Sequence, residues 1–285
     1  MALRMSHRGT RTMVQCEGGR PQRHRESFNS VAALYNRYRR GYPPAVVDAV
    51  LGVAGIGPGS RVLEIGPGTG QLTWHLLQRG AAVTGVELGP ELAALAQQNL
   101  AGFPDFEMFV SSFEDWPLPA RPFDVVVAAT AFHWVDEAVR TTKAARALGP
   151  TGVLVAIYPH QVMTSDGGFF EASQRCYLQW GLSTDPDWRA PHPHELGDTY
   201  PDIDACPAFT AVTRHRIPCP QRFTTAEYVG LLRTDSLVLT LPEPDRPGFL
   251  ADMRTLIDSE FGGMVRRGFV YEVVTAMKRP HQDGP

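Results

Sequence analysis

The chain has 285 residues, of which 43% are hydrophobic and 20% are charged. This length permits one large α/β domain, or one domain with a small appended lid, and the composition excludes collagen-like and wholly disordered chains. No apolar stretch of about 18 residues is present, so the sequence offers no membrane-spanning helix, and we expect no membrane partner.

The net charge of −3 conceals an asymmetry between the N-terminus and the rest of the chain. Residues 1–25 hold six arginines and one acidic residue, which leaves 21 basic and 29 acidic residues in the remainder. An acidic body is a poor partner for a phosphate backbone, so we expect no nucleic-acid partner. The basic segment has no apolar region typical of a secretory signal. We expect residues 1–25 to form a disordered arm.

The cysteine and histidine spacings indicate neither disulfides nor a metal site. The four cysteines lie far apart without a C-x-x-C pair, which favours reduced thiols and a cytoplasmic location. His192, His194 and Glu195 lie in a proline-rich stretch with no matching further ligand nearby, which favours a solvated loop over a metal site.

The apolar pattern begins near Phe28, and residues 26–60 read as an N-terminal helical cap. From residue 61 strands alternate with helices, which predicts a parallel sheet within a core of residues 61–158. The expected strands are residues 61–65, 82–87, 106–110, 123–129 and 153–157, and the expected helices are 71–78, 90–100 and 136–148.

This alternation fails over residues 159–208, a span that is too long for a plain connection and rich in aromatic residues. A packed surface excursion is one interpretation, and a lid over a site is the other, because long loops in compact domains are often functional. Residues 209–285 then predict strands at 209–217 and 269–277 and helices at 225–232 and 246–260. We expect this part to complete the sheet and an acceptor pocket.

The most informative motif is V-L-E-I-G-P-G-T-G at residues 62–70, where a strand leads through alternate glycines into a helix. Glycines permit the tight turn and a close approach of ligand to backbone. Dinucleotide sites use G-x-G-x-x-G, but here Gln71 occupies the position of the third glycine. The pattern instead resembles the first motif of class I S-adenosylmethionine-dependent methyltransferases.

Further segments strengthen this resemblance at the expected places. Glu87 ends the second strand, where a carboxylate can accept hydrogen bonds from both ribose hydroxyls. After the third strand, the segment 111–118 resembles the family element that holds adenine, but Ser112 stands where an Asp is usual; either Ser112 or Glu114 then takes the amine. The resemblance implies that S-adenosyl-L-methionine is the cofactor and that it is held by Glu64, Gly66, Gly68, Gly70, Glu87, Leu88, Ser112, Phe113 and Thr130.

The same resemblance implies a fold. It predicts an α/β architecture with a doubly wound, mostly parallel, seven-stranded sheet, the Rossmann-like methyltransferase fold, in which the last strand runs antiparallel beside the fifth. The lid of residues 159–208 is an insertion into this sheet.

On the acceptor side, the fourth strand leads into A-T-A-F-H-W at residues 129–134. An Asn/Asp-Pro-Pro-aromatic segment, which DNA-base and some protein-glutamine methyltransferases share, is absent. The segments 129–134, 35–43 and 231–236 resemble the trans-aconitate methyltransferase-like group of small-molecule enzymes. This resemblance implies a small-molecule acceptor in contact with Tyr35, Arg39, Trp134 and Arg233. His133 is the catalytic candidate, either as a base or as a wall of the pocket.

The function expected from the sequence is therefore methyl transfer from S-adenosylmethionine to a small molecule at an oxygen, either a carboxylate or a hydroxyl. A carboxylate, with a pKa of about 4, needs no base, whereas a hydroxyl does. The alternatives are an RNA or protein methyltransferase, a nucleotide-dependent oxidoreductase, and a cofactor binder without catalytic activity.

Overall fold

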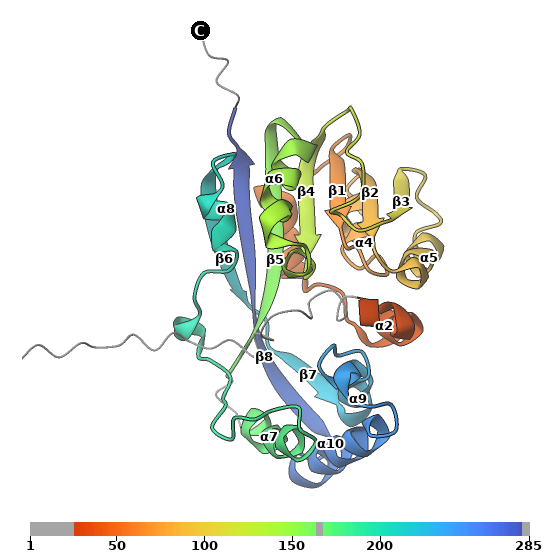
Figure 1. Cartoon of the computed structure of the whole chain (residues 1–285), viewed down its shortest axis with the longest axis vertical. Helices are drawn as coiled ribbons and strands as arrows, with labels where there is room; N and C mark the ends of the chain where they lie inside the picture. The colour runs from red at the N-terminus through yellow and green to blue at the C-terminus, as the bar shows by residue number, and fades with distance from the viewer. Residues whose placement is uncertain (1–25, 164–167, 281–285) are drawn as a thin grey trace, which may run out of the picture.

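A computed structural model describes residues 26–163 and 168–280 of the chain. The predicted basic arm of residues 1–25 lies outside the described residues. A mixed sheet with the strand order β3-β2-β1-β4-β5-β8-β6 forms the upper part of the molecule in Figure 1, and a short β7 pairs with β8 away from this path. The strands are β1 (Arg61–Ile65), β2 (Ala82–Glu87), β3 (Phe106–Val110), β4 (Phe123–Ala129), β5 (Leu148–Val162), β6 (Phe209–Pro218), β7 (Gln221–Thr224) and β8 (Met264–Lys278).

Strands β1 to β5 run parallel to one another. Strand β8 lies between β5 and β6 and runs antiparallel to both. The helices between them are α2 (Ala32–Tyr38), α3 (Pro44–Val53), α4 (Thr73–Gln78), α5 (Pro90–Asn99), α6 (Glu137–Ala147), α7 (Phe169–Gln179), α8 (Pro201–Ala205), α9 (Thr225–Leu232) and α10 (Arg246–Glu260), with short 3₁₀ turns at Asn29–Val31, Phe132–Trp134, Pro193–Glu195 and Val238–Thr240. The prediction of a doubly wound, mostly parallel sheet whose last strand runs antiparallel beside the fifth is confirmed. The short β7 is an additional strand outside the seven-strand path.

Two hydrophobic cores cover the two faces of the sheet. Side chains of α3 and α4 pack on one face, around Leu76 and Val127. Side chains of α6 and α8 pack on the other face, around Phe132 and Ile203. The strands in the centre are therefore buried on both sides, which explains the nearly continuous apolar sequence of β4.

A third core lies below the sheet in a helical lobe, which we define as α7, α9, α10 and β7 (Figure 1). The lobe is attached to the sheet through β5 and β8, which pair over ten residues, from Val153–Met277 to Val162–Gly268. Strand β5 is therefore longer than the predicted strand 153–157, and the start of the predicted lid at residue 159 lies inside it. The pairing with β8 includes residues 158–162, and Pro159, which has no N–H to donate, lies within this paired stretch.

A buried carboxylate joins the strands where the sheet passes into the lobe. Glu272 of β8 is fully buried and accepts hydrogen bonds from Arg216 Nε at 2.8 Å and from the Thr199 backbone N–H at 3.0 Å. His160 of β5 lies 3.2 Å from the same carboxylate. The network therefore connects β5, β6, β8 and the segment preceding α8.

Candidate functional site

The glycine motif forms a tight loop between β1 and α4, and two of its glycines line a cavity. Gly66 and Gly68 have positive φ angles of 64° and 62° and line a cavity of about 230 Å³ at the carboxyl ends of β1, β2 and β4. A Cβ atom on Gly66 would lie 2.7 Å from the Cβ of Ala131, so only glycine fits there. Gly70 lines neither this cavity nor its neighbour; a Cβ there would lie 2.9 Å from a methyl of Leu100.

Glu87 lies at the end of β2 and braces this loop. Its carboxylate accepts hydrogen bonds from the backbone N–H of Gly68 at 3.0 Å and of Gly89 at 2.9 Å. Burial raises the pKa of Glu87, and these hydrogen bonds oppose the rise. Leu88 lies beside it in the cavity wall.

The segment after β3 forms the opposite wall of the smaller cavity, with Ser112, Phe113 and Glu114. The Ser112 hydroxyl donates to Asp115 Oδ2 at 2.6 Å and accepts from the Asp115 backbone N–H at 3.1 Å. Glu114 Oε1 accepts from the Asp136 backbone N–H at 3.1 Å. The hydroxyl of Ser112 is therefore held in a local turn, whereas the Glu114 side chain is anchored from the next helix.

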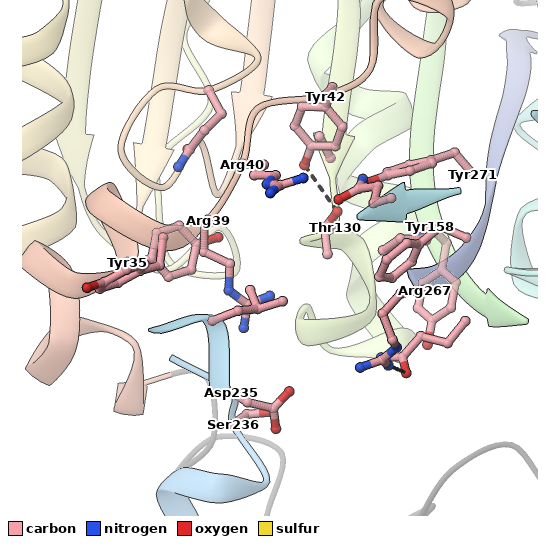
Figure 2. Close-up of a pocket in the computed structure, with 18 of the residues that line it drawn as sticks. Tyr35, Arg39, Arg40, Tyr42, Thr130, Tyr158, Asp235, Ser236, Arg267 and Tyr271 are labelled. Carbon is pink, nitrogen blue, oxygen red and sulfur yellow. Dashed lines mark hydrogen bonds between the residues drawn. The ribbon is translucent and has the colours of Figure 1, made fainter. Parts of the chain in front are cut away.

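A second cavity, of about 740 Å³, adjoins the first and extends toward the helical lobe (Figure 2). Ten of the 29 described residues that line it are Phe, Trp or Tyr, including Tyr42, Tyr158 and Tyr271. The two cavities meet at a common wall. The residues that line both cavities are Tyr35, Arg39, Gly66, Thr130, His133, Trp134, Asp235 and Ser236. The structure therefore brings the predicted residues from the N-terminal cap and from β4 together at one junction.

Two residues near this junction are unusual: Thr130 has a strained backbone, and Glu64 is a buried carboxylate. Thr130, directly after β4, has a φ of 57°, which is rare for a β-branched residue and is a common feature of functional sites. The Oγ1 of Thr130 lies 3.1 Å from the hydroxyl of Tyr42. Glu64 of β1 lines the larger cavity and accepts a hydrogen bond from Thr73 Oγ1 at 2.7 Å. Burial raises the pKa of Glu64 to about 7.

His133 lies in the wall common to both cavities, with its ring centre 4.7 Å from that of Trp134 and 5.3 Å from that of Tyr158. Its Nδ1 is buried and has no hydrogen-bond partner among the described residues. Burial, followed by the charge of Arg140, lowers the pKa of His133 to about 4. The imidazole is therefore neutral at pH 7 and is a weak base.

The two arginines predicted for the acceptor differ in their placement. Arg39 lines both cavities, but its Nε and Nη2 donate to the hydroxyl and carbonyl oxygens of Thr234 at 2.9 and 2.7 Å. Arg233 is exposed and lines neither cavity. Arg39 therefore connects the N-terminal cap to the segment after α9, and Asp235 and Ser236 are the residues of that segment that reach the cavities.

The described residues of the predicted lid reach the larger cavity and not the smaller one. Among the described residues of 159–208, Pro159, Gln161 and Tyr177 line the larger cavity and none lines the smaller one. Phe28 and Tyr35 of the cap line the smaller cavity instead. Helix α7 packs into the core of the lobe, because its apolar face is buried against α9 and α10.

No metal site is present among the described residues: no group of three His, Cys, Asp or Glu side chains there is placed to hold an ion. His192 and His194 stack on each other, and Glu195 pairs with Arg189 at 2.7 Å. Cys176, Cys206 and Cys219 are free thiols, and Cys16 lies outside the described residues. None of the described helices is long and apolar enough to cross a membrane.

The sequence also resembles known proteins. Residues 62–152 match a family model described as a methyltransferase domain. An uncharacterized methyltransferase of Mycobacterium bovis, Mb3374, is 30% identical over 239 residues, which cover 81% of this chain and 85% of the relative. The chain belongs to the class I S-adenosylmethionine-dependent methyltransferases.

Two further likenesses concern the fold and part of the sequence. An S-adenosylmethionine-dependent methyltransferase from Geobacter sulfurreducens, solved with S-adenosylhomocysteine, superposes with a TM-score of 0.52 at 14% identity, covering 88% of this chain and 98% of that one. Ribosomal RNA small subunit methyltransferase A of Synechococcus sp. (strain JA-3-3Ab) is 43% identical over 83 residues, which cover 28% of this methyltransferase and 30% of the relative. This second match is confined to less than a third of either chain.

The sequence did not identify several residues that line the cavities of this methyltransferase. Tyr42 lies in a segment that the resemblance already pointed to, so its place in the cavity wall could have been predicted. Tyr158 and Arg267 carried no such signal. Tyr158 lies in the part of β5 beyond residue 157, which pairs with β8, and Arg267 lies in the part of β8 before residue 269, which pairs with β7.

Proposed function

We propose that this methyltransferase transfers a methyl group to an oxygen atom of a small molecule. The observation that carries the proposal is the junction of two cavities at His133, Thr130 and Trp134. The larger cavity, at about 740 Å³, lies within the roughly 300–1,000 Å³ typical of small-molecule sites.

The lining of the smaller cavity suits the adenosine part of S-adenosyl-L-methionine. A carboxylate at the end of β2 and the backbone of a glycine loop suit a ribose and its neighbouring atoms. Glu64 and Glu87 are buried carboxylates without an ion-pair partner among the described residues. A cationic ligand would stabilise their ionised forms and thereby offset their burial.

We assign cofactor contacts to residues that line the smaller cavity, namely Gly66, Gly68, Glu87, Leu88, Phe113 and Thr130, and to Glu64, which lines the adjoining larger cavity. Gly70 lines neither cavity, and we assign it to packing of the loop on Leu100. Glu114 is the better candidate than Ser112 for the adenine amine, because the Ser112 hydroxyl is bonded to Asp115. When bound, S-adenosylmethionine would supply a methyl group carried on a sulfonium. The leaving group, S-adenosylhomocysteine, is a neutral thioether and requires no protonation. The protein therefore contributes positioning and exclusion of water.

The direct test is turnover. Purified protein is incubated with S-adenosylmethionine and a library of small carboxylic acids, alcohols and phenols, and S-adenosylhomocysteine is measured. Formation of S-adenosylhomocysteine together with an O-methylated product supports the proposal. Total RNA and a cell-protein extract form the comparison arms, and turnover confined to either of them would contradict it.

The lowered pKa of His133 predicts the pH dependence of the rate. A base whose pKa is about 4 is poorly matched to deprotonating a hydroxyl at pH 7, so we favour a carboxylate oxygen, which is already ionised. We expect kcat to stay flat from pH 6 to 9 in the wild type and in His133→Gln, with a loss of at most about tenfold in the variant.

The control variant is His192→Gln, which lies away from both cavities and should leave kcat unchanged. Single-turnover measurements ensure that methyl transfer limits the rate. A loss of about 10²-fold or more in His133→Gln, with a wild-type rate that rises between pH 6 and 8, would assign His133 as the base for a hydroxyl acceptor.

A further inference from the structure

Arg267 of β8 is a buried cation in the wall of the larger cavity. Its side chain is 6% exposed and lines that cavity. The guanidinium carbon lies 4.2 Å from the ring centre of Phe170 and 5.2 Å from that of Tyr228. The apolar surroundings hold the planar group in place but provide no opposite charge.

The hydrogen bonds of Arg267 leave its charge uncompensated. One terminal nitrogen donates to the hydroxyl of Tyr228 and the other to the side-chain oxygen of Gln161, both neutral acceptors. The Nε is buried and has no hydrogen-bond partner in the described part of the chain. Within residues 26–163 and 168–280 no carboxylate lies within ion-pair distance of this guanidinium. A buried charge is normally paired, so this arrangement indicates an anion supplied from outside the chain.

The other charged groups of the cavity have different assignments. Arg39 is bonded to Thr234, and Arg40 pairs with Glu227 at 2.8 Å. The Asp235 carboxylate accepts from the backbone N–H of Leu237 at 2.9 Å. Of the described cations that line this cavity, Arg267 is thus the one with both an unpartnered N–H and a buried position.

Arg267 also lies away from the junction of the cavities. It is not among the residues that line both cavities, and Figure 2 shows it across the cavity from Tyr35. A group bound at Arg267 therefore lies in the larger cavity, outside the wall that it shares with the smaller cavity, where the cofactor is assigned.

We propose that Arg267 determines acceptor specificity by binding an anionic group, a carboxylate or a phosphate monoester, at the end of the acceptor remote from the methylated oxygen. The planar fork of arginine suits two-point binding of either anion, and the aromatic walls suit a flat body between the two ends. The inference rests on the proposed function, in which the larger cavity holds the acceptor.

The test uses simple probes whose charge differs and whose shape is alike. Benzoate, phenyl phosphate and benzamide are titrated by ligand-observed NMR into the protein loaded with S-adenosylhomocysteine. At least one of the anions is expected to bind about 10- to 100-fold more tightly than benzamide, the scale of hydrogen bonds to a charged group. The stronger of the two anions identifies the group as a carboxylate or a phosphate.

Two variants localise the effect. Gln161→Glu changes only an amide into a carboxylate beside Arg267, and the internal ion pair should reduce anion binding by about 10- to 100-fold with little effect on benzamide. Arg267→Met should do the same. Arg266→Gln is the matched control, because Arg266 is the exposed neighbour on the same strand and lines neither cavity; it should leave all three affinities unchanged.

The readouts separate the possible failures. Equal binding of benzoate, phenyl phosphate and benzamide, no binding of either anion at 10 mM, or unchanged anion binding in Gln161→Glu would each overturn the assignment of Arg267. Retained calorimetric binding of S-adenosylhomocysteine shows that a variant is folded. If the wild type itself gives no heat with S-adenosylhomocysteine, the proposed function fails, whatever the anions do.

Discussion

Glu87→Ala should bind S-adenosylhomocysteine about 10- to 150-fold more weakly than the wild type, a loss of about 1.5–3 kcal/mol. In the folded protein the carboxylate accepts the N–H groups of Gly68 and Gly89. The substitution thus removes both the proposed acceptor for the ribose hydroxyls and a brace of the glycine loop. Isothermal titration calorimetry measures the change directly.

Two further variants separate these contributions. Glu87→Gln retains the shape of the side chain, but its amide can accept through only one oxygen, so we expect an intermediate loss of affinity. Glu91→Ala removes an exposed carboxylate in the first turn of α5 and should leave the affinity unchanged. Wild-type affinity in Glu87→Ala, or measurable binding of NAD in place of S-adenosylhomocysteine, would contradict the assignment of this cavity.

The cofactor side of the site could be predicted because its determinants are local in sequence. Each of its main elements follows a strand of the parallel sheet: the glycine loop follows β1, Glu87 ends β2, and Thr130 follows β4. The carboxyl ends of parallel strands meet at one edge, so correct strands are sufficient to bring these residues together. The periodicity and the glycine motif determine the strands almost to the residue.

The acceptor side could not be predicted to the same extent, because it depends on long-range pairing. Arg267 enters the larger cavity through the pairing of β7 and β8, in which it lies opposite Gln221. The exposed Arg233 lies in a segment that resembles an acceptor element, but the side chains of that segment that reach the cavity are Asp235 and Ser236. A motif identifies the segment and leaves open which of its side chains faces inward.

The pairing of β8 with β5 and β6 places the buried carboxylate of Glu272 where these strands meet, and this residue gives the largest expected effect on stability. Burial opposes ionisation of Glu272, but the hydrogen bonds from His160, Thr199 and Arg216 outweigh it, and the pKa falls to about 2 from an ordinary 4.5. A carboxyl whose folded pKa is depressed stabilises the native state above its unfolded pKa. That stability is lost as the pH falls from about 4.5 toward 2.

We therefore expect Glu272→Gln to lower the free energy of unfolding by roughly 3 kcal/mol at pH 7, the equivalent of the pKa shift. Urea unfolding at pH 7, 4 and 3 should show the two proteins converging in acid, because the wild type alone loses the contribution of an ionised Glu272. Glu260→Gln is the control: Glu260 pairs with Arg175 at 2.7 Å on the surface, and exposed pairs contribute at most about 1 kcal/mol. A constant difference between wild type and Glu272→Gln from pH 7 to 3 would show that the loss comes from packing rather than from the ionised carboxylate.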